Sequence, residues 1–88
     1  MLDKDKLFLV VYFGIEGVDR FYGNQVMAGF YEKLKNTLDD TVKVYVVPQR
    51  TTKEIKMELL NIENCSEEKL SNIEKIYQEI LNDIKKPV

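Results

Sequence analysis

Arginine is scarce in this chain, and its placement is the strongest chemical signal in the sequence. The 88 residues contain 13 lysines and arginines, of which Arg20 and Arg50 are the arginines. Each stands in a polar stretch at the edge of a predicted element. A guanidinium group presents a planar fork of N–H donors, which matches the oxygens of a phosphate better than the point charge of lysine does. Two guanidinium groups on neighbouring loops would therefore suit a phosphate-bearing ligand.

The segments around the two arginines supply further hydrogen-bond donors. Gly14–Gln25 contains a loop with glycines and leads into a predicted helix, and Pro48–Lys53 is a polar stretch that follows a predicted strand. The N-terminus of that helix adds free backbone N–H groups, which favour an anion. The candidate ligand-binding residues are Arg20, Tyr22, Asn24, Gln25, Arg50, Thr51, Thr52 and Lys53. The alternative is an ordinary solvated loop in which the arginines pair with Asp19 or Glu54.

The composition argues against catalysis. The chain has no histidine and one cysteine, Cys65, so a thiol nucleophile would have no histidine base. Glu16 and Asp19 share a loop without a third ligand nearby, which is more typical of surface charge than of a metal site or an acid–base pair. We expect a non-enzymatic protein with no catalytic residue, no metal and no cofactor. The net charge of −2 argues against binding of duplex nucleic acid.

Hydrophobic patterning predicts five elements. Leu7–Phe13 is a run of seven apolar residues, which is typical of a strand covered on both faces. Glu54–Asn61 alternates with a period of two, which favours a strand, although its residue types also suit a helix. In chain order we expect a strand over Leu7–Phe13, a helix over Gln25–Leu38, strands over Val42–Val47 and Glu54–Asn61, and a helix that begins after Ser66.

The element order β-α-β-β-α predicts a single α+β domain over residues 1–88. Two sheet orders satisfy the connection rules: 1-2-3, and 1-3-2 with the first strand antiparallel to the third. We prefer the second, a truncated ferredoxin-like fold whose three-stranded sheet carries two helices on one face. It pairs the second and third strands as a hairpin. It also leaves the apolar first strand at an edge, where a second protomer would extend the sheet into a homo-oligomer.

This topology gathers the candidate residues at one edge of the sheet. The loop after the first strand, the hairpin turn and the end of the last helix at Lys85–Lys86 all fall there. Within the first helix, Asn24 is the expected N-cap, and Gly29 predicts close packing at mid-helix. The apolar run is far shorter than the ~20 residues of a membrane helix, so we expect a cytoplasmic protein without a membrane partner.

One segment carries a resemblance. VYVVPQRTTKEIKMELLN, at residues 44–61, follows an apolar strand that ends in Tyr-Phe-Gly, and this combination resembles a group of small, uncharacterised tailed-phage proteins. In that group, a Pro-x-Arg turn links two strands. The resemblance covers about half of the chain and implies a phage origin. Some small phage proteins bind host defence components or sequester signalling nucleotides, and the resemblance implies a role of this kind.

Two functions follow from these observations. The first is a non-enzymatic, oligomeric binding module that captures a phosphate-bearing small ligand, such as a signalling nucleotide, at the arginine-bearing edge. The alternative is a protein-interaction module that inhibits or scaffolds a host or phage protein through the exposed face of the sheet. A nucleotide site would depend on Arg20, Arg50 and Lys53, whereas a protein interface would depend on apolar side chains.

Overall fold

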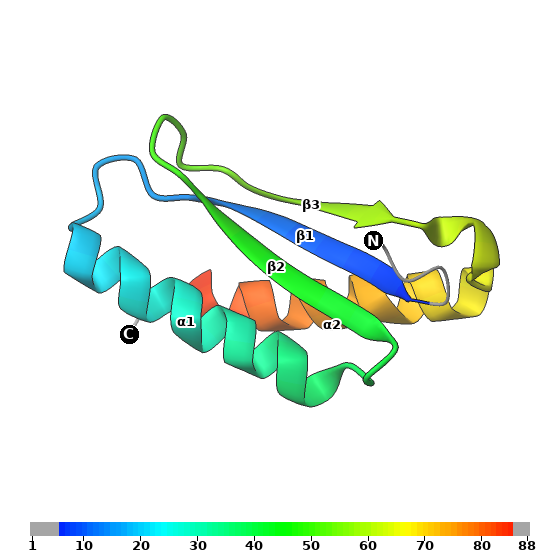
Figure 1. Cartoon of the computed structure of the whole chain (residues 1–88). Coiled ribbons are helices and arrows are strands. Elements are labelled where there is room, and N and C mark those ends of the chain that lie inside the picture. Colours follow the sequence, from blue (N-terminus) through cyan, green and yellow to red (C-terminus); the bar gives the residue numbers. More distant parts are fainter. Residues whose placement is uncertain (1–5, 86–88) are drawn as a thin grey trace.

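The chain folds into one sheet with both helices on the same side of it (Figure 1). The computed structural model describes residues 6–85. Its elements are β1 (Leu7–Gly14), α1 (Arg20–Thr37), β2 (Val42–Gln49), β3 (Ile55–Leu60), a 3-10 turn (Ile62–Asn64) and α2 (Glu67–Lys85). The predicted α+β class, the element order and the three-stranded sheet are confirmed, and the segment that was open between strand and helix is the strand β3.

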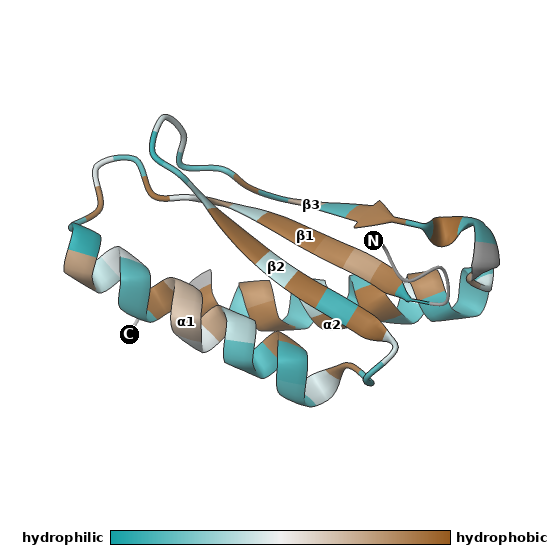
Figure 2. Cartoon of the chain, in the orientation of Figure 1, coloured by the Kyte–Doolittle hydropathy of each residue, from teal (hydrophilic) through white to brown (hydrophobic). Residues whose placement is uncertain are grey.

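The order of the strands differs from the prediction. It is β2-β1-β3. The predicted antiparallel pairing of the first strand with the third is confirmed. β2, however, is parallel to β1 and does not pair with β3, so the predicted hairpin between β2 and β3 is wrong. β1 is the central strand and is paired along both sides, so a second protomer cannot extend the sheet at β1. A central position suits the most apolar strand, because its neighbours on either side shield it from water. Figure 2 shows β1 as an almost continuously apolar ribbon.

The two faces of β1 have different surroundings. Leu9, Val11 and Phe13 belong to the buried core that the helices complete. The residues between them point to the opposite side, because side chains alternate along a strand. That side, called the open face below, carries Phe8, Val10 and Tyr12 of β1, and no element among residues 6–85 packs over it (Figure 1). The apolar run of β1 therefore contributes to two faces of the sheet. One face is covered by the helices, and the other is flanked only by the neighbouring strands.

The core is centred on Phe30 of α1, which is fully buried. Its ring meets that of Phe13 edge-on at 5.4 Å between centroids and that of Tyr77 at 6.1 Å. These three aromatic rings join β1, α1 and α2, and Leu34 and Ile73 fill the space beside them. The last helix therefore packs on the sheet.

The helix starts follow side-chain capping. α1 begins at Arg20, five residues before the predicted start, because the carboxylate of Asp19 accepts a hydrogen bond from the Tyr22 N–H at 3.2 Å. The predicted cap, Asn24, lies inside the helix. At α2, the Ser66 hydroxyl accepts from the Lys69 N–H at 3.2 Å, so Ser66 caps the helix that was predicted to begin after it. Within residues 6–85, neither helix is long and apolar enough to cross a membrane.

The buried Tyr77 predicts a loss of stability at alkaline pH. It is 3% exposed, and burial raises the pKa of its hydroxyl. In the unfolded chain a tyrosine ionises near pH ~10, whereas folded Tyr77 keeps its proton to higher pH. Above this pH the unfolded state binds fewer protons, so the free energy of unfolding falls as the pH rises. In Tyr77→Phe the melting temperature should fall less steeply between about pH 9 and pH 11 than in the parent; parallel curves would contradict this.

Candidate ligand site at the loop end

The connection from β2 to β3 crosses over the end of β1. The Ile15 N–H donates to the Gln49 carbonyl at 2.8 Å, and the Glu16 N–H donates to the Thr52 carbonyl at 3.0 Å. A side chain at Gly14 would stand 2.3 Å from the Glu54 carbonyl oxygen, so glycine is what lets the two segments approach. Residues 14–20 and 50–54 are called the loop end below. Their predicted convergence at one edge is confirmed for the backbone, although the strand order that implied it is wrong.

The helix N-terminus at the loop end already has a partner. Asp19 places a carboxylate on the first turn of α1, where the sequence predicted free N–H groups for an anion. A second negative group at this position would be repelled by Asp19. The loop end must therefore bind an anion through side chains if it binds one at all. Gly17, the residue with a φ of +75°, turns the chain just before this cap.

The two arginines are exposed at the surface of the loop end. Arg20 is the first residue of α1, and Arg50 follows β2 directly. Within residues 6–85, neither guanidinium makes a hydrogen bond or an ion pair. The pairings that an ordinary loop would use are absent from the same residues, because Asp19 caps α1 and the Glu54 carboxylate lies 3.3 Å from the Lys56 ammonium. Both guanidinium groups are therefore available to a ligand.

The other predicted residues divide between helix and loop. Tyr22, Asn24 and Gln25 are exposed but lie on the first two turns of α1, so they do not form the loop that the sequence predicts. Thr51 and Lys53 are exposed in the connection between β2 and β3. No hydrogen bond or ion pair joins these two groups directly within residues 6–85. The backbone bonds of Ile15 and Glu16 are what hold the two segments beside each other.

Thr52 has a defined local role. It is half-buried, and its hydroxyl accepts a hydrogen bond from the Glu54 N–H at 3.1 Å. This bond turns the chain toward β3, as serine and threonine hydroxyls do in short turns. Since a hydroxyl can donate its own proton while it accepts, Thr52 keeps one donor for a ligand.

A cavity of about 360 Å³ opens where the loop end meets the open face. Thr52 is the predicted residue that lines it. The remaining lining residues are Tyr12, Gln49, Glu54 and Lys56. The prediction missed Tyr12 and Lys56, because it took its candidate residues from the two loops and not from the face of the strands. The alternation of β1 and β3 was the signal that places these two side chains on one face.

Tyr12 carries a polar contact within this region. Its hydroxyl donates to the Glu58 carboxylate at 3.1 Å. This hydrogen bond, followed by the negative charge of Glu58, raises the pKa of the Tyr12 hydroxyl. The phenol therefore stays neutral at physiological pH, and its ring forms an uncharged wall of the cavity.

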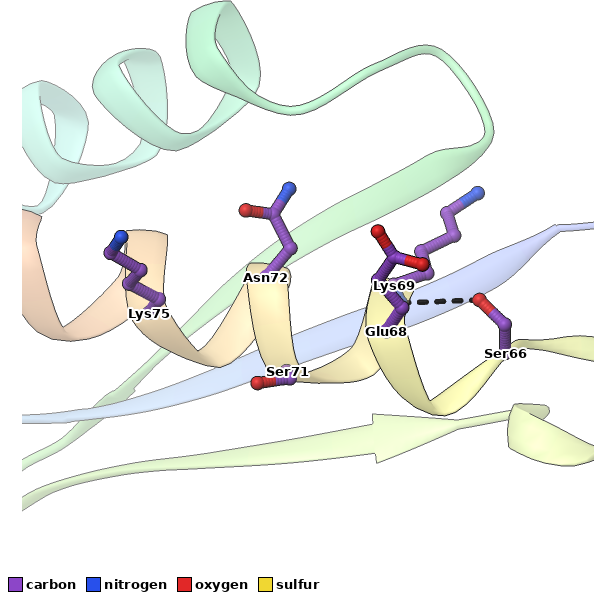
Figure 3. A pocket seen from close by; sticks show the side chains of 6 residues that line it. All are labelled: Ser66, Glu68, Lys69, Ser71, Asn72 and Lys75. Carbon is purple, nitrogen blue, oxygen red and sulfur yellow. Dashed lines mark hydrogen bonds between the residues drawn. The ribbon is translucent and has the colours of Figure 1, made fainter.

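Another hollow, of about 510 Å³, lies on the surface of α2 (Figure 3). Its lining comes from one helix and its cap: Ser66, Glu68, Lys69, Ser71, Asn72 and Lys75. Ser71 points away from the side chains of Asn72 and Lys75 in Figure 3, so these groups do not converge on one point. We assign no function to this surface.

The comparisons with known proteins leave the site without a precedent. Neither protein-family models, nor curated proteins, nor solved structures match this chain. The resemblance to tailed-phage proteins therefore stays a prediction. Within residues 6–85, no group of three or more Asp, Glu, Cys or His residues could hold a metal ion, and Cys65 is a half-buried free thiol. Of the predicted Lys85–Lys86 pair, Lys86 lies outside the described residues, while α2 runs toward the loop end (Figure 1).

Proposed function

We propose that this chain is a non-enzymatic binding module that captures a phosphate-bearing small ligand, such as a signalling nucleotide, at the loop end. The observation that carries the proposal is the pair of unpaired guanidinium groups, Arg20 and Arg50, on two segments joined by backbone hydrogen bonds. An exposed arginine beside carboxylates normally pairs with one. Here Asp19 caps α1 and Glu54 pairs with Lys56, so neither guanidinium is ion-paired within residues 6–85. The loop end as a whole carries as many carboxylates (Glu16, Asp19 and Glu54) as cations (Arg20, Arg50 and Lys53), so the proposal depends on the unpaired guanidinium groups and not on net charge.

The neighbouring groups suit the rest of a nucleotide. Thr51, Thr52 and Lys53 add hydroxyl and ammonium donors beside Arg50, and a phosphate can accept from several of them at once. The adjoining cavity of about 360 Å³ is walled by the neutral Tyr12 ring and by the Gln49 amide. An aromatic ring and an amide are groups that stack on a base and hydrogen-bond its edge. The phosphate would then lie at the loop end and the base in the cavity.

The test is a thermal-shift screen of adenine and guanine mono-, di- and triphosphates and cyclic dinucleotides at about 1 mM. A nucleotide present at ten times its Kd adds about 1.4 kcal/mol to the free energy of unfolding. In a domain of this size that raises the melting temperature by roughly 6–10 °C. Arg50→Ala should abolish the shift in melting temperature. Arg50→Lys should lose much of it, because an ammonium group cannot form the bidentate hydrogen bonds that a guanidinium group forms with two phosphate oxygens.

A matched control separates this effect from loss of charge. Lys75→Ala removes one exposed cation from α2, away from the loop end, and should keep the full shift. Arg50→Ala itself should change the free energy of unfolding by less than ~0.5 kcal/mol, since an exposed loop side chain without partners contributes little. The proposal fails if no phosphate compound raises the melting temperature of the parent, or if both Arg50 variants respond as the parent does.

The second candidate function is a protein-interaction module that inhibits or scaffolds a host or phage protein. The observation in its favour is the open face, where Tyr45 and Leu60 are 51% and 43% exposed. Exposed aromatic and aliphatic side chains on one surface are typical of protein contacts. Tyr45→Ser would weaken such a complex and leave nucleotide binding unchanged, whereas Arg50→Ala would do the reverse.

The remaining predictions stay part of this proposal. A phage origin, a cytoplasmic location and a homo-oligomeric state all agree with a small ligand-sequestering protein. Homo-oligomers place several copies of a site on one particle, which raises the capacity of each particle for a ligand. β1 lies between two other strands, so assembly needs a surface other than the edge of β1.

A further inference from the structure

The open face has an apolar centre. Tyr45, Val47 and Leu60 flank the central strand there and are 51%, 36% and 43% exposed. Phe8 lies between Lys43 and Leu60 in the sheet and is 6% exposed, and its ring stacks on that of Tyr45 at 6.2 Å between centroids. These side chains are arranged before any partner arrives, so covering them costs little conformational entropy.

The face also carries an ordered pair of charges. Lys56 and Glu58 stand two residues apart on β3, so they project on the same side of the sheet. Their neighbours on β1 are Tyr12 and Val10, respectively. The lysine and the glutamate are therefore two residues apart along the strand, on the same face.

We infer that the open face is the contact between two copies of this chain, stacked face to face. Consider a two-fold axis that lies between the two stacked sheets, perpendicular to the strands, at a level between Val10 and Tyr12 of β1. Each strand then lies over the same strand of the second copy, running in the opposite direction. It exchanges the position of Lys56 with that of Glu58, so each lysine faces the glutamate of the second copy. The symmetry then produces two identical pairs of opposite charge. The same axis sets Val10 against Tyr12 of the second copy. Because Tyr12 and Lys56 also line the cavity beside the loop end, a base bound there would lie between the two copies.

The other side chains of the open face agree with this arrangement. Tyr45 lies beside Val10, and Val47 lies beside Tyr12, so the axis sets Tyr45 against Val47 of the second copy. Phe8 falls opposite Gly14 of the second copy, where no side chain obstructs the ring. An axis along the strands would instead set Tyr45 against Glu58 and bring no opposite charges together. Lys43, which lies beside Phe8 on the same face, falls opposite Gln49 in the first arrangement and opposite Leu60 in the second. Within one chain Lys56 lies 3.3 Å from Glu54, and Glu58 accepts from the Tyr12 hydroxyl at 3.1 Å. The opposite charges of Lys56 and Glu58 therefore favour the first arrangement.

A second copy covers more of the exposed surface in this way than by pairing at the free edge of β2. Extension of the sheet at β2 would leave Leu60, on the opposite strand, exposed. Pro48 also removes one N–H donor from that edge. Face-to-face contact covers Tyr45, Val47 and Leu60 together.

The dimer should be weak. Three strands about 4.8 Å apart, two of 8 residues and one of 6 at ~3.3 Å per residue, span on the order of 350 Å². This is about half of the ~800 Å² per partner in a typical stable interface. A Kd of roughly 10–100 μM is therefore expected, and the assembly should depend on concentration.

Sedimentation velocity between about 5 and 500 μM tests the arrangement through charge reversal. Lys56→Glu sets two glutamates against each other at both symmetric positions, and Glu58→Lys does the same with lysines. Each should raise the Kd of the parent dimer at least tenfold. The double variant Lys56→Glu/Glu58→Lys restores both pairs and should bring the Kd back to within about threefold of the parent. These folds are on the scale of a charge pair at a partly desolvated interface.

Two controls complete the experiment. Lys75→Glu, on α2, changes the net charge as much as Lys56→Glu does and should leave the Kd unchanged. Arg50→Ala should also dimerise normally, so a failure of the proposed nucleotide site and a failure of the dimer can be told apart. A parent that stays monomeric at 500 μM overturns the inference. A double variant that dimerises no better than the single ones also overturns it, and would favour the β2 edge or a different protein as the occupant.

Discussion

Phe30→Ala is expected to lower the free energy of unfolding by about 3–5 kcal/mol. Phe30 is fully buried, and its ring touches Phe13 of β1 and Tyr77 of α2, so its removal leaves a cavity where all three elements meet. A domain of 88 residues has roughly 4–13 kcal/mol of stability in total. The loss is therefore a large fraction of the whole, and the melting temperature should fall by roughly 15–30 °C in a calorimetric or circular-dichroism melt.

Phe21→Ala is the matched control on the same helix. Phe21 is 72% exposed, so its truncation should change the free energy of unfolding by less than ~0.5 kcal/mol. Equal losses in the two variants would contradict the placement of Phe30 at the centre of the core. The two variants also test whether the first turn of α1 points Phe21 outward. The sequence predicted a loop there, over Gly14–Gln25, and not a helical turn.

The elements were predictable because hydrophobic alternation reports local burial. Ile55, Met57 and Leu59 alternate toward the helices, and this was enough to identify β3 against the helix-favouring composition of its segment. Helix starts were less predictable. Asp19 and Asn24 both favour an N-cap, and the exposed Phe21 and Tyr22 carry no core signal that would extend the helix back to Arg20.

The order of the strands was not predictable from these patterns. A strand as apolar as β1 suits the centre of a sheet, but the central position requires the connection from β2 to cross over its end. The crossing is possible because Gly14 has no side chain, which would otherwise overlap the backbone of Glu54. The prediction placed close packing at Gly29 instead, where a side chain would meet nothing within 4 Å. Composition identifies glycines, but only the fold shows which of them is enclosed.

The candidate site was predictable in part for a related reason. The loop end was expected because both sheet orders place the β2–β3 connection at the end of β1 where its own loop begins. Arg20 and Arg50 therefore reach the same end under either order. Tyr12 and Lys56 were not assigned to the adjoining cavity, although the predicted order already pairs the third strand with the first, because the candidate residues were taken from the loops and not from the face of the strands. Asp19 as the helix cap, which closes the predicted N-terminal anion position, depends on the true start of α1.

Gly14→Ala is expected to cost about 3 kcal/mol, the upper end of what overpacking of a buried site costs. The new methyl carbon would stand 2.3 Å from the Glu54 carbonyl oxygen and 2.7 Å from the Glu54 nitrogen. Both atoms belong to the backbone, so no side-chain rotation relieves the overlap. The connection between β2 and β3 must move, and the hydrogen bond from Glu16 to Thr52 should break with it. A denaturant titration measures the loss directly.

Gly29→Ala is expected to change the free energy of unfolding in the opposite direction. Position 29 lies within α1 and has space for a methyl group, so alanine should stabilise the domain by about 0.5–1 kcal/mol through its higher helix propensity. If Gly14→Ala were as stable as the parent, the crossing of the two segments at the loop end would be wrong. If Gly14→Ala is unstable but still folded at low temperature, its loop end is displaced. Any nucleotide that shifts the parent should then fail to shift this variant, because Arg50 moves with the connection.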